Sequence, residues 1–375
     1  MKIPLQCRYL LGYVSLSLLL MAAMPAAALQ VTGLYSHRVA VANETDSERE
    51  LAFRQALTAV ILKVTGERRW LDHPKVQQAL NDAQNYVEAI AYSSEMMKLP
   101  ESGTVAQSNN EAATSIIQQR FIEVDFAARL IDQLLADANI PVWDSNRPSV
   151  LLWVALQDAE GNRTLLSTDG NADIISTIQS YAKERGLPVI FPVLDFEDRR
   201  NLPEDLVWSL NEIAIRRASE RYNADSVLAG RLHFTASGEL VGLWQFQFGG
   251  NSEVFDGFDT GIEGYLKVPL ERITARLASY FAIVPKALVT DTVSLKVEGV
   301  SNLEDYSAVL SYLGNLGLVE SVLPAVLDGE QLELKLDLVG NTDQLHELIA
   351  LDRDLLPIQS SQTGNGAVLH YRWTR

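Results

Sequence analysis

The chain has 375 residues, which is too long for one compact core and predicts two or three domains. Apolar residues make up 47% of it and charged residues 21%, a globular composition that excludes wholesale disorder and collagen-like repeats. With 48 acidic against 31 basic side chains the net charge is −17, so phosphate backbones would repel the protein and nucleic-acid binding is not expected.

The first 28 residues have the pattern of a secretory signal peptide. Two basic residues precede an uncharged apolar run (10–24), which a proline and three alanines follow. We expect cleavage after Ala28, which makes the mature chain periplasmic, with a net charge of −19 and without cysteine, because Cys7 is the only one. An uncleaved membrane anchor is the alternative, although the run is shorter than the roughly 20 residues that a span needs. No later stretch is long enough to span a membrane.

Residues 29–142 form the first predicted domain, with the element order βααββα. Its clearest element is a helix in which five apolar residues share one face: Phe53, Leu57, Val60, Ile61 and Val64. Thr45 and Glu48 have the spacing of a capping box at its start, and Gly66 is expected to end it. The polar segment 101–114, rich in glycine, serine and asparagine taken together, is expected to be a flexible loop.

A linker over 140–148 leads into the second predicted domain, residues 149–284. Its first strand (150–156) is apolar throughout and is therefore expected to be buried on both faces. The remaining elements, in chain order, are a helix, a strand, a helix, a hairpin and a helix: 173–185, 189–194, 203–222 with Ile213 facing inward, 226–248 around Ser237-Gly238, and 266–280. This order indicates an α/β domain.

Residues 290–375 form the third predicted domain, with the order βαββαβ. Ser301 and Glu304 have capping-box spacing at the start of its first helix, and Asp328-Gly329 is typical of a tight hairpin turn. The order is that of the ferredoxin-like split βαβ fold. The predicted fold class is therefore three small mixed domains, α+β or α/β.

Sequence motifs of the common catalytic centres are absent. Five histidines are spread along the chain with no pair at zinc-site spacing, and no G-x-S-x-G, P-loop or G-x-G-x-x-G motif is present. Asp259-Thr260-Gly261 resembles the triplet of aspartic proteases, but such sites need two copies and the chain has one. We therefore expect no catalytic residues, no metal and no cofactor.

An acidic cluster is the strongest of the weak candidates for a site. Asp195, Glu197 and Asp198 follow the second strand of the middle domain, and the carboxyl ends of strands are where α/β folds bind ligands. A hydrolase centre or a site for a cation or basic ligand is one interpretation. The other is a solvated loop, because Arg199 and Arg200 come next and can neutralise the carboxylates.

Trp143 is the other candidate, because it lies beside the linker and an aromatic side chain there suits packing between domains. Trp153 and Trp244 lie on predicted strands and are more simply explained as core residues.

Several short motifs resemble an uncharacterised proteobacterial family, domain of unknown function 2066. In chain order they are Leu34-Tyr35, Glu48-Arg49, Gln55-Ala56-Leu57, Val64-Thr65-Gly66, Val124-Asp125-Phe126, Trp143, Asn146-Arg147-Pro148-Ser149, Trp153, Gly186-Leu187-Pro188 and Glu220-Arg221-Tyr222-x-Ala224-Asp225. The resemblance implies export in Gram-negative bacteria and no assigned activity. The segment 224–230 is also similar to the amino-terminal domain of the translocation protein TolB, which implies a TolB-like middle domain that binds periplasmic proteins.

The sequence therefore favours a non-enzymatic periplasmic protein that binds or scaffolds components of the cell envelope. Its acidity predicts a basic protein partner. One alternative is a hydrolase whose site forms only in the fold around Asp195, Glu197 and Asp198. Another is a binder of a small ligand or glycan, which would have an aromatic-lined pocket in the middle domain.

Overall fold

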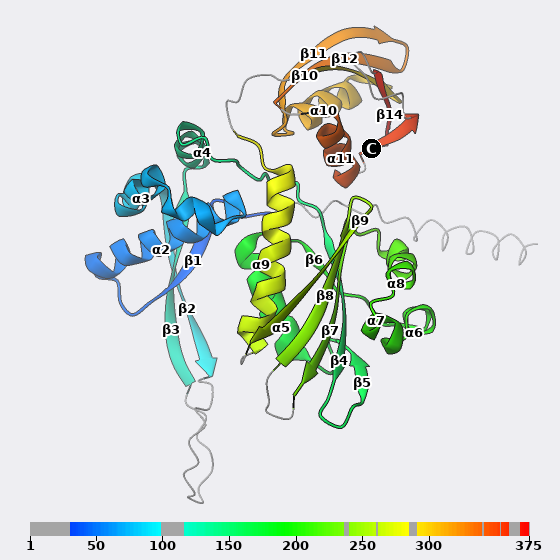
Figure 1. Ribbon diagram of the computed structural model, residues 1–375. Helices are drawn as coiled ribbons and strands as arrows, with labels where there is room; N and C mark the ends of the chain where they lie inside the picture. The colour runs from blue at the N-terminus through cyan, green and yellow to red at the C-terminus, as the bar shows by residue number, and fades with distance from the viewer. Residues whose placement is uncertain are drawn as a thin grey trace, which may run out of the picture.

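The computed structural model describes residues 31–98, 116–235, 240–259, 262–284, 291–339, 341–352, 354–359 and 368–374. These residues fold into three sheets with helices packed against them, a mixed α+β structure. Figure 1 shows three units in chain order, coloured blue to cyan, green to yellow, and orange to red. The expected leader, the expected loop 101–114 and the turn Ser237-Gly238 lie outside the described residues, as do Thr260 and Gly261.

The first unit is an antiparallel sheet covered by helices. Its elements are β1 (Ser36–Val41), α2 (Asp46–Thr65), α3 (Pro74–Asn81), β2 (Val87–Lys98), β3 (Ile116–Phe126) and α4 (Ala128–Asp137), and the strand order is β1-β3-β2. The apolar face of α2 packs on the sheet, with Leu57, Val60 and Ile61 fully buried. Each such side chain contributes roughly 1.5–3 kcal/mol by leaving water.

The start of α2 differs from the predicted capping box. Thr45 is the N-cap residue, but its hydroxyl donates to Asn43 Oδ1 (2.6 Å) and makes no bond to the helix. Glu48 accepts instead from the main-chain N–H of Ala42 (3.1 Å), three residues before the N-cap. At the other end Gly66 has a φ of 73° and donates to Leu62 O, the left-handed C-cap that glycine adopts without a steric penalty.

His37 on β1 lies partly buried next to the Lys63 ammonium, which donates to the carbonyl oxygens of Gly33 and Ser36 (both 2.9 Å). Burial lowers the pKa of His37 to about 4, and the charge of Lys63 acts in the same direction. The ordinary pKa of histidine is 6.5. Between these values the unfolded chain binds more protons than the folded protein, so stability falls as the pH falls from 6.5 towards 4.

We expect His37→Gln to flatten this acid dependence. Between about pH 6.5 and pH 4.5 the unsubstituted protein should lose about 1–2 kcal/mol more of its free energy of unfolding than the variant, a discounted fraction of the full shift because the ring is only partly buried. Urea unfolding of both proteins across this range measures the two slopes. Packing lost through the substitution is the same at every pH and cancels from the comparison, so equal slopes would contradict the prediction.

The middle unit is a six-stranded sheet with helices on both faces. Strands β5 (Arg163–Leu165), β4 (Val150–Gln157), β7 (Ser226–Phe234), β8 (Leu240–Phe248) and β9 (Asn251–Asp259) lie in that order, and β6 (Val189–Ile190) also pairs with β4. Helices α5 (Ala172–Arg185) and α9 (Ile262–Phe281) cover one face, and α6 (Phe196–Asn201), α7 (Glu204–Trp208) and α8 (Glu212–Ser219) lie on the other (Figure 1). Leu152 and Leu151 of β4 belong to the cores on opposite faces, so β4 is buried on both.

Three details of the middle unit differ from the sequence prediction. The strands β5 and β9 are additional. The predicted helix 203–222 is divided, because Leu210 has a φ of 50° and the Asn211 side chain accepts from Ala214 N–H (3.0 Å), which starts α8 as a new helix. Ile213 consequently points outward and is 74% exposed.

The third unit contains β10 (Asp291–Glu298), α10 (Leu303–Gly314), β11 (Val319–Asp328), β12 (Gln331–Leu338), α11 (Thr342–Asp352), β13 (Leu355–Gln359) and β14 (Val368–Trp373). The strand order is β11-β12-β10-β14-β13. Strand β13 is absent from the predicted βαββαβ order. In the predicted βαββαβ order, the last strand would run antiparallel to the first strand, β10. In the structure β13 reverses the chain once more after α11, so the last strand, β14, runs parallel to β10.

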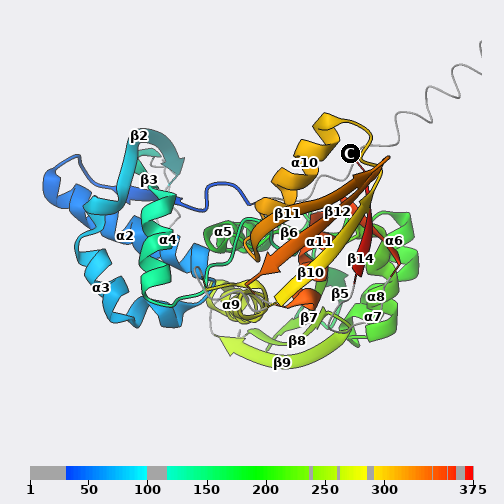
Figure 2. The same ribbon diagram turned by 90° about the horizontal axis from the view of Figure 1, so that it is seen from above.

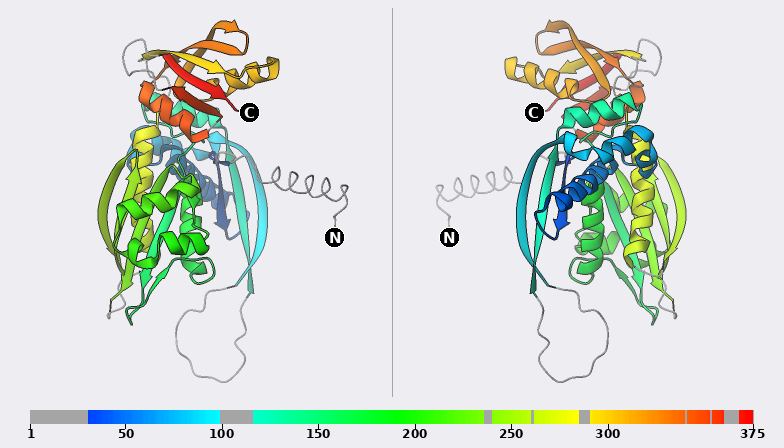
Figure 3. Two further views of the ribbon diagram at one scale, coloured as in Figure 1. Left: turned by 90° about the vertical axis from the view of Figure 1, so that its right-hand side faces the viewer. Right: turned by 90° about the vertical axis from the view of Figure 1, so that its left-hand side faces the viewer.

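The three units meet near the C-terminal end of α9, around Phe281 and Ile283. Seen from above in Figure 2 and from both sides in Figure 3, the first unit lies beside α9 and α5, and the third unit lies beyond the C-terminal end of α9. The linker between the first two units contributes residues 142–144 and 146 to this region.

Candidate functional site

The acidic cluster is held by Arg221, which lies in the segment before β7. Asp195 is the N-cap of α6 and accepts from Asp198 N–H (2.9 Å). The Arg221 guanidinium donates to both oxygens of Asp195 (2.8 and 2.9 Å) and to Asp198 Oδ1 (2.9 Å). Glu197 is more distant, at 3.7 Å from Arg221, and is exposed. The guanidinium holds the pKa of the Asp195 carboxyl well below its usual range.

Asp198 is buried at the centre of the same network. Its second oxygen accepts from Leu194 N–H (2.9 Å) and from the Tyr222 hydroxyl. Burial and this bond raise the pKa of Tyr222 to about 12. Both carboxylates therefore have all their oxygens bonded to donors, which fits a structural ion pair that orders the loop before α6. Both carboxylates are thus paired with one guanidinium that neutralises much of their charge, an arrangement that the structure explains without a bound ligand.

Trp143 lies at the contact between the first and middle units. Its side chain is 1% exposed, and its main-chain N–H donates to Val64 O at the end of α2 (2.8 Å). The neighbouring Val142 pairs with Ile283 just after α9, with two bonds of 2.8 and 2.9 Å. The indole lies 4.2 Å from the Arg147 guanidinium. The linker thus joins the ends of two helices that belong to different units.

Arg147 ties this contact together with five hydrogen bonds. Each of its five N–H groups donates to a main-chain carbonyl oxygen, at 2.7–3.1 Å: Trp143, Asp144, Lys63, Arg185 and Gly186. Three of these carbonyls lie at the C-terminal ends of α2 and α5, where the partial charge is negative and a cation is favourable. Burial lowers the pKa of Arg147 to about 9, and the five acceptors compensate the charged guanidinium.

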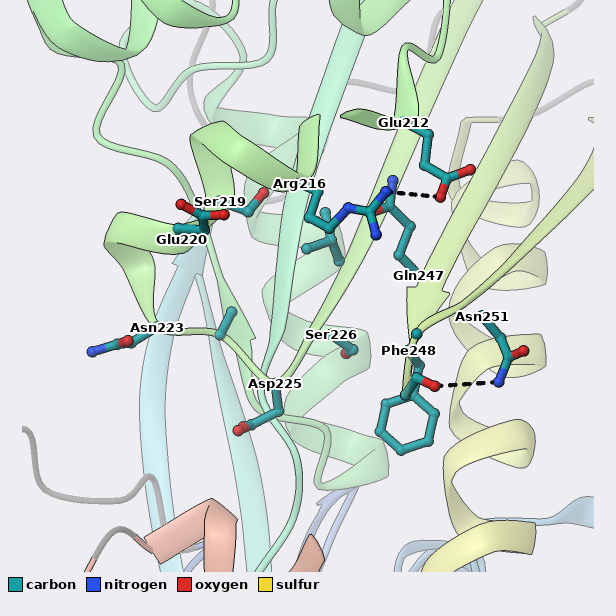
Figure 4. Close-up of a pocket in the computed structure, with 14 residues that line it drawn as sticks. Glu212, Arg216, Ser219, Glu220, Asn223, Asp225, Ser226, Gln247, Phe248 and Asn251 are labelled. Carbon is teal, nitrogen blue, oxygen red and sulfur yellow. Dashed lines mark hydrogen bonds and ion pairs between the residues drawn. The ribbon is translucent and has the colours of Figure 1, made fainter. Parts of the chain in front are cut away.

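A groove surrounds the turn between β8 and β9, and we call it the turn groove. One part, of about 450 Å³, lies between α8, the start of β7 and the turn (Figure 4). The other part, of about 350 Å³, continues towards α9 and α11. The two parts share Phe248, Gly249 and Asn251, so they adjoin at the turn, one on the α8 side of the sheet and the other on the α9 side. Gly249 and Gly250 both have positive φ values, which let the chain turn tightly here.

The turn groove is lined by an excess of carboxylates. Its charged residues are five acids and two arginines: Glu212, Glu220, Asp225, Glu253, Glu347, Arg216 and Arg276. Glu212 pairs with Arg216 (3.2 Å), and Glu253 pairs with Arg272 outside the lining. Asp225 accepts from the Ser149 N–H and hydroxyl (both 2.7 Å). The lining therefore attracts positive charge.

Three hydroxyl groups of the turn groove donate hydrogen bonds within the protein. Ser219 donates to Ile215 O (2.7 Å), and Ser226 donates to Ser149 O (3.0 Å). Tyr280 donates to Glu347 Oε1 (2.9 Å), and burial raises its pKa to about 12. No histidine is found among the described lining residues. A nucleophile needs an adjacent base to accept its proton, and Ser219 and Ser226 each donate to a main-chain carbonyl instead.

The groove was not among the sequence predictions, because its walls come from four separate segments. The nearest signals were Gly249-Gly250 after an apolar strand and the carboxylates of the segment 220–225. Within the described ranges, no group of three or more His, Cys, Asp or Glu side chains is arranged to hold a metal ion. Over those same ranges, no helix combines the length and apolar character needed to cross a bilayer.

Residues 28–144 match a protein family described as "Domain of unknown function (DUF8605)". This finding corrects the resemblance proposed from the sequence motifs, because it is a different family from domain of unknown function 2066, and the similarity to the TolB amino-terminal domain is likewise not supported. No curated protein matches the sequence. A solved structure described as "Crystal structure of uncharacterized protein" is 10% identical over 36% of this chain and 91% of its own, with a TM-score of 0.17, too low to support any inference about the fold.

Proposed function

We propose that the chain is an exported, non-enzymatic binding or scaffold protein of the cell envelope, and that the turn groove holds a basic segment of a partner protein. The observation that carries this proposal is the lining of the groove, which has three more carboxylates than arginines, while the hydroxyls of Ser219 and Ser226 donate to main-chain carbonyls. Such a surface attracts cations. Export is supported by the leader pattern of the first 28 residues.

The arrangement of the units supports a scaffold. Arg147 bonds main-chain atoms of the first unit, the linker and the middle unit at once, so these units are held in a fixed relation. The third unit contributes Glu347 to the turn groove, so the binding surface needs two units in place. A basic segment would approach a body with a net charge of −19, which favours fast, electrostatically steered association.

Site-specific photocrosslinking in cells tests the proposal. A photoreactive side chain at Asn251, in the turn groove, should capture one dominant envelope protein, which mass spectrometry then identifies. The matched control carries the same side chain at Gln133 on α4, which is exposed and does not line the groove. Capture of the same proteins from both positions, or of none from Asn251, would contradict a partner in the groove.

A charge reversal tests the sign of the partner. Glu220 is exposed in the groove, and Glu220→Lys should weaken capture about tenfold, because it replaces an attraction by a repulsion. Glu160→Lys makes the same change of net charge on the exposed β4–β5 turn and should leave capture within about twofold. Equal effects of the two variants would show that only net charge matters.

A further inference from the structure

A second hollow lies where the three units meet, and we call it the junction cavity. Its volume is about 260 Å³. The first unit contributes Tyr35 and Asp132, and the linker contributes Trp143 and Asp144. The remaining walls come from the middle and third units and are mainly apolar: Phe281, Ile283, Leu316 and Leu348. Contacts between domains are a common location for ligand sites with apolar walls and a few polar groups.

The polar side chains of the junction cavity are two carboxylates, a phenol and the amide of Asn146, which donates to Leu348 O (3.4 Å). Asp132 Oδ1 accepts from the Tyr35 hydroxyl (2.7 Å), and Asp144 Oδ1 accepts from the Ser145 N–H (2.6 Å). In the part of the chain that the structure describes, neither carboxylate has an ion pair with a basic side chain. Both carboxylates line the same cavity. Burial raises the pKa of Asp132; the hydrogen bond from Tyr35 acts against this rise and the charge of Asp144 adds to it.

The nearest basic side chain offsets only part of this negative charge. Arg147 stacks on the Trp143 ring and its charge interacts with Asp144, but all five of its N–H groups are bonded to main-chain carbonyls, so it donates to neither carboxylate. The lining residues of the cavity include no lysine, arginine or histidine. Two carboxylates and one guanidinium leave a net negative charge beside apolar walls, and a cation with an apolar body would complement it.

We propose that the junction cavity binds a small organic amine, with its ammonium group facing Asp132 and Asp144 and its apolar body against Trp143, Phe281 and the leucines of the third unit. Aromatic rings favour a nearby cation, and the carboxylates supply the opposite charge. The volume suits one ring or a short chain. This site is separate from the turn groove and does not depend on the function proposed for it.

Benzylamine is the probe, and benzyl alcohol is its neutral counterpart of nearly the same shape. Calorimetric titration of the full chain near pH 7 should give a dissociation constant for benzylamine at least about tenfold lower than for benzyl alcohol, because only the amine carries the charge. Equal affinities for the two probes, or no binding of benzylamine at millimolar concentration, would overturn the proposal.

Neutralising each carboxylate gives a second, independent measurement. Asp132→Asn and Asp144→Asn should each weaken benzylamine binding about tenfold, whereas Asp125→Asn, on the exposed side of β3, should not change it. Without ligand, Asp132→Asn should leave the melting temperature unchanged or raise it, because it removes a repulsion. A lower melting temperature with unchanged amine affinity would assign the carboxylates to structure alone and overturn the proposal.

Discussion

Replacing Arg147 by methionine is expected to lower the free energy of unfolding by about 3–5 kcal/mol, because it leaves five buried main-chain carbonyls without their donor. Methionine keeps most of the volume and removes the charge and all five donors. Three of the carbonyls lie at the C-terminal ends of α2 and α5, which belong to different units. Losing their hydrogen bonds therefore weakens the contact between the units as well as each helix end. We therefore expect the first unit to unfold before the middle unit in the variant.

Urea unfolding measures the loss in the free energy of unfolding. Hydrogen exchange of the α2 amides, measured at each urea concentration, shows whether the first unit unfolds first. The control is Arg129→Met on α4, an exposed arginine, which should change stability by less than about 0.5 kcal/mol. Arg147→Lys should fall between the two, because lysine keeps the charge but offers three donors in place of five. If Arg147→Met unfolds at the same urea concentration as Arg129→Met, the guanidinium does not hold the units together.

The elements predicted most closely are those whose pattern is local. The apolar face of α2 and the fully apolar strand β4 follow from the spacing of neighbouring residues, and both are buried in the structure. Short strands lack such a pattern. β5 has three residues and is absent from the prediction, and the strand predicted over 189–194 is reduced to the two residues of β6. β13 contains Pro357, which argues against a strand unless it lies at an edge. β13 is an edge strand, which is information that only the fold supplies.

The residue that caps a helix is also hard to predict from the sequence. The predicted box of Ser301 and Glu304 is replaced by Asn302, which caps α10 by accepting from Asp305 N–H (2.9 Å). Both asparagine and serine favour the N-cap, so the residue types identify a helix start but not which of two adjacent residues provides the cap.

The candidate sites depend on contacts between distant segments. The acidic cluster has a structural explanation because Arg221 and Tyr222, more than twenty residues later in the chain, bond to its carboxylates. The sequence offered Arg199 and Arg200 as partners, but the Arg199 side chain donates to Leu194 O (2.8 Å) instead. Spacing along the chain could therefore place the cluster in a loop but could not identify its counter-ion.

Gly66→Ala is expected to lower the free energy of unfolding by about 2–4 kcal/mol, for two separable reasons. The φ of 73° costs an alanine about 1 kcal/mol. In addition, a Cβ at this position would overlap the Cβ of Ala278 on α9 and approach the Trp143 ring to 3.0 Å. Overpacking of this kind costs roughly 1–3 kcal/mol, because α2 and α9 must move apart.

A second substitution separates the two costs. Ala278→Gly removes the overlapping methyl group, so the double variant should recover about 1–2 kcal/mol relative to Gly66→Ala, although Ala278→Gly alone destabilises α9 by about 1 kcal/mol. Urea unfolding of the four proteins gives the coupling free energy. Additive effects would mean that the backbone conformation of Gly66 accounts for the whole loss and that α2 and α9 do not press against each other at this point. A clear recovery of stability would instead show that α2 of the first unit packs against α9 too closely for any residue larger than glycine at position 66. Arg147 and Trp143 of the linker donate hydrogen bonds to the same end of α2, so they stabilise the same contact between units.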